Sequence, residues 1–299
     1  MSTLVAFGLG YSATALGGLL RSDGWQVIGT GRSPSSLART ASDGLKAMQF
    51  DGENVSEELL QAIEAATHIV VSAPPGEKGD PVLRQCGDAI ASAPELQWIG
   101  YLSTIGVYGD HGGAWVDETT SPNPYSARSR ERLAAENAWA KLGTEMGVPT
   151  QIFRLAGIYG PGRSQLEKLL AGEKHSVFKP GQVFNRIHVD DIAAVLYAAI
   201  EKTQADASLE GVFNVTDDEP APPQDVTAYA ASLLGMPTPP LVSIEDANLS
   251  LMARSFYSEN KRVHNERIKR DLGVTLAHPT YREGLAAIYG ELRNRGAVK

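Results

Sequence analysis

The feature that most constrains the fold lies in the first sixteen residues, where an apolar run meets closely spaced glycines. Residues 4–7 are apolar, and Gly8, Gly10 and Ala13 follow at the spacing G-x-G-x-x-A before a stretch rich in Ala and Leu. Gly8 suits a tight turn, Gly10 allows close approach of the backbone to a pyrophosphate, and Ala13 lets a helix pack closely on a strand. This order predicts a dinucleotide-binding unit with phosphates at the positive end of the helix. A tight strand–helix turn without a ligand is the alternative.

The predicted phosphate-binding residues are therefore those of the turn and the first helical turn, namely Gly8, Gly10, Tyr11, Ser12 and Ala13.

Strand-like and helix-like stretches alternate along the rest of the chain. Strands are predicted at residues 25–30, 47–50, 67–71, 98–102, 151–155 and 211–215. Helices are predicted at residues 57–66, 83–93, 192–202, 225–234, 265–272 and 281–294, with Asp190 or Asp191 as the N-cap of the third. This alternation favours an α/β fold with right-handed crossovers and a doubly wound parallel sheet.

Beyond about residue 160 the alternation weakens and prolines become more frequent. We therefore predict a dinucleotide-binding domain over residues 1–160, to which residues 187–215 return. Residues 161–186 and 216–299 are predicted to form a smaller substrate-binding part.

The ends of three predicted strands carry candidate cofactor contacts. Arg32 and Ser33 end the second strand, about where an acidic residue would mark a preference for NAD, so they favour the 2′-phosphate of NADP. A solvated loop arginine is the alternative. Asp51 is a candidate partner for the adenine amino group or, equally, a turn aspartate. Ala73 and Pro74 end a strand at the edge where open α/β sheets bind ligands.

Charge and composition exclude several classes of function. The net charge of −8 and a pI of about 5.3 leave no basic surplus for nucleic acid or an anionic membrane. The single cysteine, Cys86, suits a reducing cytoplasm, and we see neither a signal peptide nor an apolar run long enough to span a membrane.

No Cys/His set has the spacing of metal ligands, so no metal is predicted. We expect a monomer or a homodimer.

Several further blocks, in order, resemble the extended short-chain dehydrogenase/reductase superfamily, which includes NAD(P)-dependent epimerases and dehydratases. They are Ser103-Thr104-x-x-Val107-Tyr108-Gly109, Val116-Asp117-Glu118, Arg154-Leu155-x-x-Ile158-Tyr159-Gly160-Pro161-Gly162, Arg186-Ile187-His188-Val189-Asp190-Asp191 and Val212-Phe213-Asn214-Val215. The resemblance implies a Rossmann-type domain, a small C-terminal substrate domain and an active site between them. It also implies that Thr104 occupies the position of the catalytic Ser/Thr hydroxyl. A local backbone hydrogen bond is the alternative role for Thr104.

The chain departs from the superfamily at the hallmark Tyr-x-x-x-Lys. Tyr125 is followed four residues later by Ser129 rather than by lysine. Alignment on Glu136 instead places Arg128 and Arg132 at the tyrosine and lysine positions, on one predicted helix face with Ala135, Trp139 and Leu142. Asn123 and Pro124 would begin this helix, with Tyr125 in its first turn.

Arginine cannot serve as a general acid, because its pKa exceeds 12. We therefore expect Arg132 to hold the nicotinamide ribose, Arg128 to bind an anionic substrate group or oxyanion, and Tyr125 to be the candidate proton donor. Surface ion pairs with Glu131 or Glu136 are the alternative for the arginines, and packing at the helix start is the alternative for Tyr125.

Other cleft residues are proposed from the same blocks. Tyr108 and Tyr159 are alternative proton donors, and packing against the cofactor is the favoured role of both. Tyr108, Arg163 and Arg186 are expected to face the substrate, and His188 is interpreted as a structural histidine.

Two functions from different classes are compatible with these features. The first is an NADP(H)-dependent oxidoreductase or epimerase/dehydratase-like enzyme acting on a small carbonyl or sugar-like substrate, with an anionic substrate as one option. The second is an NADP-binding sensor or regulatory protein without turnover.

Overall fold

Apolar strands build the centre of the protein. In the computed structural model, which describes residues 1–42 and 44–298, a seven-stranded sheet has the order β11-β7-β5-β4-β1-β2-β3, and every pairing in it is parallel. Its strands are β1 (Thr3–Phe7), β2 (Gln26–Gly31), β3 (Lys46–Gln49), β4 (His68–Val71), β5 (Trp98–Thr104), β7 (Thr150–Leu155) and β11 (Gly211–Val215). The predicted doubly wound parallel sheet is confirmed, with strand ends within a residue or two of those expected.

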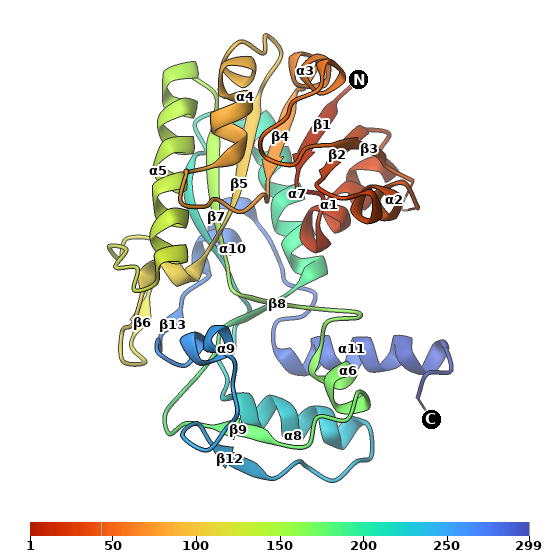
Figure 1. The fold of residues 1–299 in the computed structure, drawn as a ribbon, viewed down its shortest axis with the longest axis vertical. Helices are drawn as coiled ribbons and strands as arrows, with labels where there is room; N and C mark the ends of the chain where they lie inside the picture. The colour runs from red at the N-terminus through yellow and green to blue at the C-terminus, as the bar shows by residue number, and fades with distance from the viewer. Residues whose placement is uncertain (43, 299) are drawn as a thin grey trace.

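Both faces of this sheet are covered by helices. Along β1, Leu4 and Ala6 belong to one hydrophobic core, whereas Val5 and Phe7 belong to the other. Figure 1 shows α4 and α5 on one face and α1 and α7 on the other. Because both faces of the sheet are buried, the strand sequences are continuous apolar runs and do not alternate between apolar and polar residues.

The helices that cover the sheet are α1 (Tyr11–Ser22), α2 (Pro34–Ser42), α3 (Glu57–Glu64), α4 (Pro81–Ala91), α5 (Ala127–Met146), α7 (Val189–Ala205) and α10 (Glu266–Leu272), and a short 3₁₀ turn, η1, spans Ile105–Tyr108. None of the helices among the described residues is long and apolar enough to cross a membrane.

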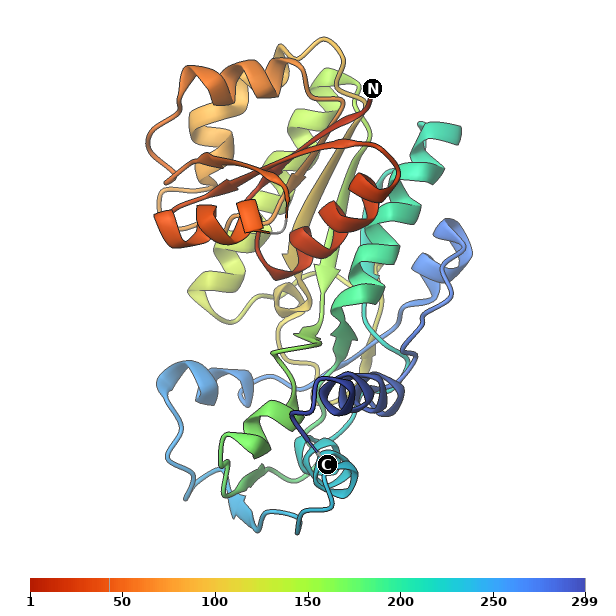
Figure 2. The ribbon, with the colours of Figure 1, turned by 90° about the vertical axis from the view of Figure 1, so that its right-hand side faces the viewer.

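A second, smaller hydrophobic core lies beyond the carboxyl ends of the strands (Figures 1 and 2). It includes side chains of α6 (Gln165–Leu170), α8 (Pro223–Leu233) and α11 (Tyr281–Asn294). The remaining elements are α9 (Leu251–Phe256) and three parallel strand pairs, β6 (Trp115–Val116) with β13 (Arg262–Val263), β8 (Gly157–Tyr159) with β10 (Arg186–His188), and β9 (Ser176–Phe178) with β12 (Leu241–Ser243).

The start of α7 differs from the prediction. The N-cap is His188, whose side chain accepts a hydrogen bond from Asp190 N, rather than Asp190 or Asp191. The helix begins at Val189, so both aspartates already lie in its first turn. The buried Asp191 carboxylate instead accepts hydrogen bonds from the backbone of Ala277 and His278.

A buried ion pair joins α5 to the sheet. Arg154 of β7 donates from Nε and Nη2 to the Glu136 carboxylate, with Nη2 lying 2.7 Å from Oε2 and with 5% and 4% of the two side chains exposed. Ser103 of β5 donates to the same carboxylate. Because Glu136 belongs to α5, this contact sets the rotation of the helix over two neighbouring strands.

We predict that Glu136→Gln lowers the free energy of unfolding by about 3–5 kcal/mol, because it leaves the Arg154 guanidinium buried without a counter-charge. Urea denaturation of the variant and of the wild type measures the effect. Ser103→Ala is the control, and it should cost about 0.5–1.5 kcal/mol. If Glu136→Gln and Ser103→Ala lost the same free energy of unfolding, the charge of Glu136 would not contribute to stability.

Candidate functional site

The turn after β1 has the geometry that the glycine spacing predicts. Gly8 has a φ of +82°, and a Cβ there would lie 3.0 Å from Ala73 N, so only glycine fits without strain. Gly8 N donates to Thr30 Oγ1, and Ser72 Oγ donates to Gly8 O. Gly10 is the N-cap of α1 and supplies no side-chain cap. The first N–H groups of α1 therefore remain available for an anion.

A cavity of about 790 Å³ lies beside this turn, at the carboxyl ends of β1, β2, β3 and β4. Strand β1 stands between β2 and β4, so the direction of chain crossover reverses at this place in the sheet. Open α/β sheets bind ligands at this reversal. Seven of the predicted cofactor residues line the cavity: Gly8, Gly10, Arg32, Ser33, Asp51, Ala73 and Pro74.

One side of the cavity combines a cation with hydroxyl groups. Arg32 is exposed there, directly after β2. Ser33 and Ser36 cap the start of α2 reciprocally, since Ser33 N donates to Ser36 Oγ and Ser36 N donates to Ser33 Oγ. The arrangement places one positive charge and two hydroxyl groups at the end of β2, which suits a phosphate monoester.

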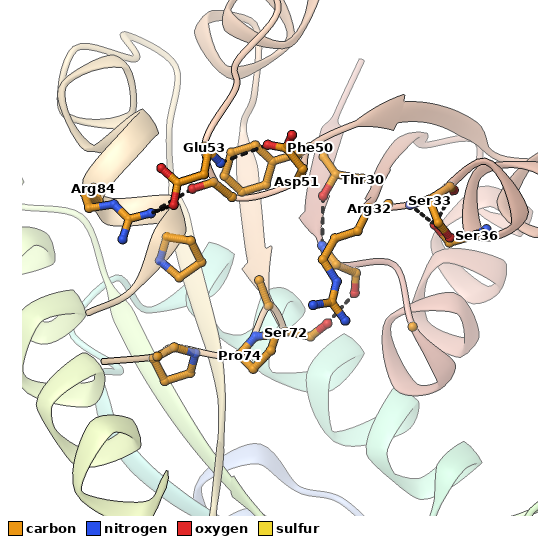
Figure 3. A pocket seen from close by; sticks show the side chains of 18 of the residues that line it. Thr30, Arg32, Ser33, Ser36, Phe50, Asp51, Glu53, Ser72, Pro74 and Arg84 are labelled. Carbon is orange, nitrogen blue, oxygen red and sulfur yellow. Dashed lines mark hydrogen bonds and ion pairs between the residues drawn. The ribbon is translucent and has the colours of Figure 1, made fainter. Parts of the chain in front are cut away.

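The opposite side is built around a carboxylate turn (Figure 3). Asp51 Oδ1 accepts from the backbone N–H groups of Glu53 and Asn54, and Asp51 Oδ2 accepts from Asn54 Nδ2. The hydrogen bonds from Asn54, followed by that from Glu53, lower the pKa of Asp51 to about 2. Arg84 Nη2 donates to Gly52 O and to Glu53. Asp51 thus both shapes the turn and lines the cavity, and its contact with adenine stays a prediction.

The predicted start of α5 at Asn123 and Pro124 is wrong. The helix begins at Ala127 with Ser126 as its N-cap, because the Ser126 hydroxyl accepts from Ser129 N. Asn123 and Pro124 lie outside the helix. Tyr125 therefore precedes the helix instead of forming its first turn, and 71% of its surface is exposed.

The inward face of α5 contains Arg132 but not Arg128. Arg132 is 9% exposed, and its Nη1 donates to Tyr101 Oη at 3.2 Å and to Leu102 O at 2.9 Å. One turn earlier, the buried residue is Ser129, whereas Arg128 is exposed. The ion pair of Arg132 with Glu136, weighed as an alternative, is not formed, since that carboxylate is held by Arg154 and Ser103. The contact of Arg132 with the nicotinamide ribose stays a prediction.

Thr104 ends β5 and is half-buried. Its Oγ1 accepts a hydrogen bond from Gly106 N at 3.1 Å, the local contact weighed as the alternative role. The hydroxyl proton of Thr104 is not used in that bond.

Two of the predicted cleft tyrosines lie in hydrophobic cores. Tyr108 is fully buried, its hydroxyl donates to Asn214 Oδ1 at 2.8 Å, and Arg154 lies over its ring. Tyr159 packs edge-on against His188, and burial raises its pKa. Tyr108 is therefore a core residue in this structure, and contact of either tyrosine with a ligand stays a prediction.

The remaining predicted residues lie towards the smaller core. Tyr11 Oη donates to Pro161 O, and the exposed Arg163 lies over the Tyr11 ring at 6.0 Å. Arg186 is half-buried, and its Nη1 donates to Phe184 O and Ala221 O. Burial lowers the pKa of Arg186.

The structure thus brings together the predicted residues at the ends of β1, β2, β3 and β4. The other predicted site residues are absent from the lining of this cavity: Tyr11, Ser12, Ala13, Thr104, Tyr108, Tyr125, Arg128, Arg132, Tyr159, Arg163 and Arg186. The sequence reasoning missed Ser36, Ser72 and Arg84, which also line it. Ser36 lies at the start of α2, a helix that was not predicted, but its position three residues after Ser33 was a usable signal. Arg84 carried no such signal, because it reaches the cavity from α4.

Comparison with known proteins agrees with this geometry. Residues 88–216 match the NAD dependent epimerase/dehydratase family. A solved structure from Silicibacter pomeroyi, described as a functionally unknown conserved protein, is 49% identical, covers 97% of this chain and 99% of its own, and has a TM-score of 0.88. Protein YeeZ of Escherichia coli K12 is 26% identical over 297 residues, which are 93% of this chain and 97% of YeeZ.

The structure of the UDP-glucuronic acid 4-epimerase of Bacillus cereus in complex with NAD is 18% identical, with a TM-score of 0.75 over 98% of this chain and 99% of the epimerase. At that identity the likeness concerns the fold alone. The fold is Rossmann-like, and residues 88–216 match the model of the NAD dependent epimerase/dehydratase family.

Proposed function

We propose that the protein is an NADP(H)-dependent oxidoreductase or epimerase/dehydratase-type enzyme that acts on a small carbonyl or sugar-like substrate. The observation that carries this proposal is the 790 Å³ cavity at the crossover reversal, lined by the Gly8 turn, Arg32 and Asp51. The match of residues 88–216 to the NAD dependent epimerase/dehydratase family supports the same ligand class.

The cofactor would lie across the carboxyl edge of the sheet. Its adenosine end would sit between the ends of β2 and β3, with a 2′-phosphate against Arg32, Ser33 and Ser36. Its pyrophosphate would meet the first N–H groups of α1. Since β5 is next to β4 in the sheet, the nicotinamide end would approach Thr104.

The substrate would bind between the domain of residues 1–160 and the smaller part formed by residues 161–186 and 216–299. Hydride transfer to a carbonyl leaves an alkoxide, which must be stabilised and protonated. The free hydroxyl proton of Thr104 suits a hydrogen bond to that oxygen, and the exposed Arg128 suits an oxyanion or an anionic substrate group. Tyr125 is the proposed proton donor, because arginine cannot supply a proton.

A second candidate is an NADP-binding sensor without turnover. It is supported by the position of Tyr125, which lies before α5 and not on the helix face that carries Arg132. Both candidates require NADP binding. They differ in whether NADPH is oxidised when a panel of carbonyl compounds is supplied.

We predict that Arg32→Ala weakens NADP binding about 10- to 100-fold and leaves NAD binding nearly unchanged. A hydrogen bond to a charged group contributes about 1.5–3 kcal/mol, and about 1.4 kcal/mol corresponds to a tenfold change in affinity. Calorimetric titration of both dinucleotides measures the ratio. The matched control is Arg84→Ala, since Arg84 lines the same cavity but is bound to Glu53. An unchanged NADP/NAD ratio in Arg32→Ala would contradict the assignment.

We also predict that Tyr125→Phe lowers turnover by about 10²- to 10⁴-fold, the usual contribution of general acid catalysis, at nearly constant NADP affinity. Turnover is measured by NADPH oxidation with any carbonyl compound that the wild type accepts. Arg128→Ala should impair anionic substrates, whereas Arg130→Ala, a neighbouring arginine that donates to Tyr125 O, should not. Wild-type rates for Tyr125→Phe would remove this tyrosine from the mechanism.

A further inference from the structure

Three metal-ligating side chains meet where the sheet domain joins the smaller core. His188 and Asp190 flank the start of α7, and His278 lies in the loop before α11. One ligand atom from each residue falls within 4.8 Å of the others. His188 Nδ1 is 3.6 Å from Asp190 Oδ2, and His278 Nε2 is 4.0 Å from the same oxygen.

The cluster is held in place by buried groups outside it. The Asp191 carboxylate, 1% exposed, accepts hydrogen bonds from Ala277 N at 2.7 Å and His278 N at 3.1 Å. This contact ties the loop that carries His278 to the first turn of α7. The two imidazole rings consequently lie with their centroids 4.0 Å apart.

One member of the cluster is buried with an unused polar atom. His188 is 2% exposed, and its Nε2 has no hydrogen-bond partner among the described residues. Its Nδ1 accepts a single bond from Asp190 N, at 3.2 Å. Asp190, with 63% of its side chain exposed, opens the cluster to solvent. Nδ1 of His188, rather than the unpartnered Nε2, faces Asp190 Oδ2, and the exposed Asp190 carboxylate makes the cluster accessible to solvent.

We propose that His188, Asp190 and His278 bind one divalent transition-metal ion of the zinc class, with a remaining coordination position open to solvent. Two imidazole nitrogens and one carboxylate oxygen are a zinc-type ligand set, whereas calcium and magnesium require mainly oxygen ligands. Bonds of about 2.0–2.2 Å in tetrahedral geometry separate ligand atoms by about 3.4 Å. Two of the observed spacings, 3.6 and 4.0 Å, lie within about 0.6 Å of this value, and all three ligand atoms lie within 4.8 Å of one another. Small side-chain rotations that draw the imidazoles towards Asp190 would complete the site.

The ion would tie the start of α7 to the loop before α11. In binding, Nδ1 of His188 would exchange its one backbone hydrogen bond for a metal bond. Spacing along the chain could not reveal this site, because His278 is far from His188 in the sequence. The proposal is independent of cofactor binding and of turnover.

The test is a titration of the chelator-treated full-length protein with Co²⁺, followed by visible d–d absorption, and then displacement with Zn²⁺. We expect one Co²⁺ per chain, loss of the absorption on addition of Zn²⁺, and a Zn²⁺-dependent rise in melting temperature. Loss of an outer-shell partner of a metal site usually weakens metal binding about 10- to 100-fold. His278→Ala and Asp190→Asn remove direct ligands, so each should weaken Co²⁺ binding by more than this.

The matched control is His264→Ala. His264 forms an ordinary surface pair with a carboxylate, with Nδ1 3.3 Å from Glu266 Oε2, and its loss should leave Co²⁺ affinity unchanged. Because the Asp190 side chain is mostly exposed, Asp190→Asn keeps the test valid even when His278→Ala does not fold. Absence of Co²⁺ and Zn²⁺ binding to the wild type, or wild-type affinity in Asp190→Asn, would overturn the proposal.

Discussion

The Glu136–Arg154 ion pair is the contact on which the arrangement of α5 over the carboxyl ends of β5 and β7 depends. It joins the long helix α5 to β7, and through Ser103 to β5, inside a core where unpaired charges are costly. Once Glu136 is fixed, helical periodicity directs Arg132 towards β5 and leaves Arg128 exposed. Thr104 ends the strand that Ser103 belongs to. The positions of three proposed functional residues thus follow from one buried carboxylate.

The parts of the site that the sequence predicted are those determined locally. The Gly8 turn needs a left-handed backbone, and strand ends are marked by Arg32, Asp51 and Pro74, so these residues could be located from pattern alone. The doubly wound sheet likewise follows from alternating strands and helices. Each of these features has a signal in the local sequence, even where its contacts, such as that of Gly8 with Ala73, join distant segments.

What could not be predicted depends on contacts between distant segments or on a choice between similar caps. Ser126 and Asn123 are both good N-caps, and only the packing of α5 selects Ser126. His188 caps α7 because Asp191 is engaged with the backbone of residues 277 and 278. Arg84 reaches the cavity from another helix, and the burial of Tyr108 depends on Asn214 of β11.

The order of strands in the sheet has a consequence for synthesis on the ribosome. Strand β11 covers the edge of β7, yet it is made more than fifty residues later, and α7 and α10 also follow β7 in the chain. A nascent chain that ends after β7 therefore exposes an unpaired strand edge and the apolar face that contains Leu102 and Phe153. Such surfaces favour aggregation. We expect the growing polypeptide to need chaperone protection until residue 272 has left the exit tunnel.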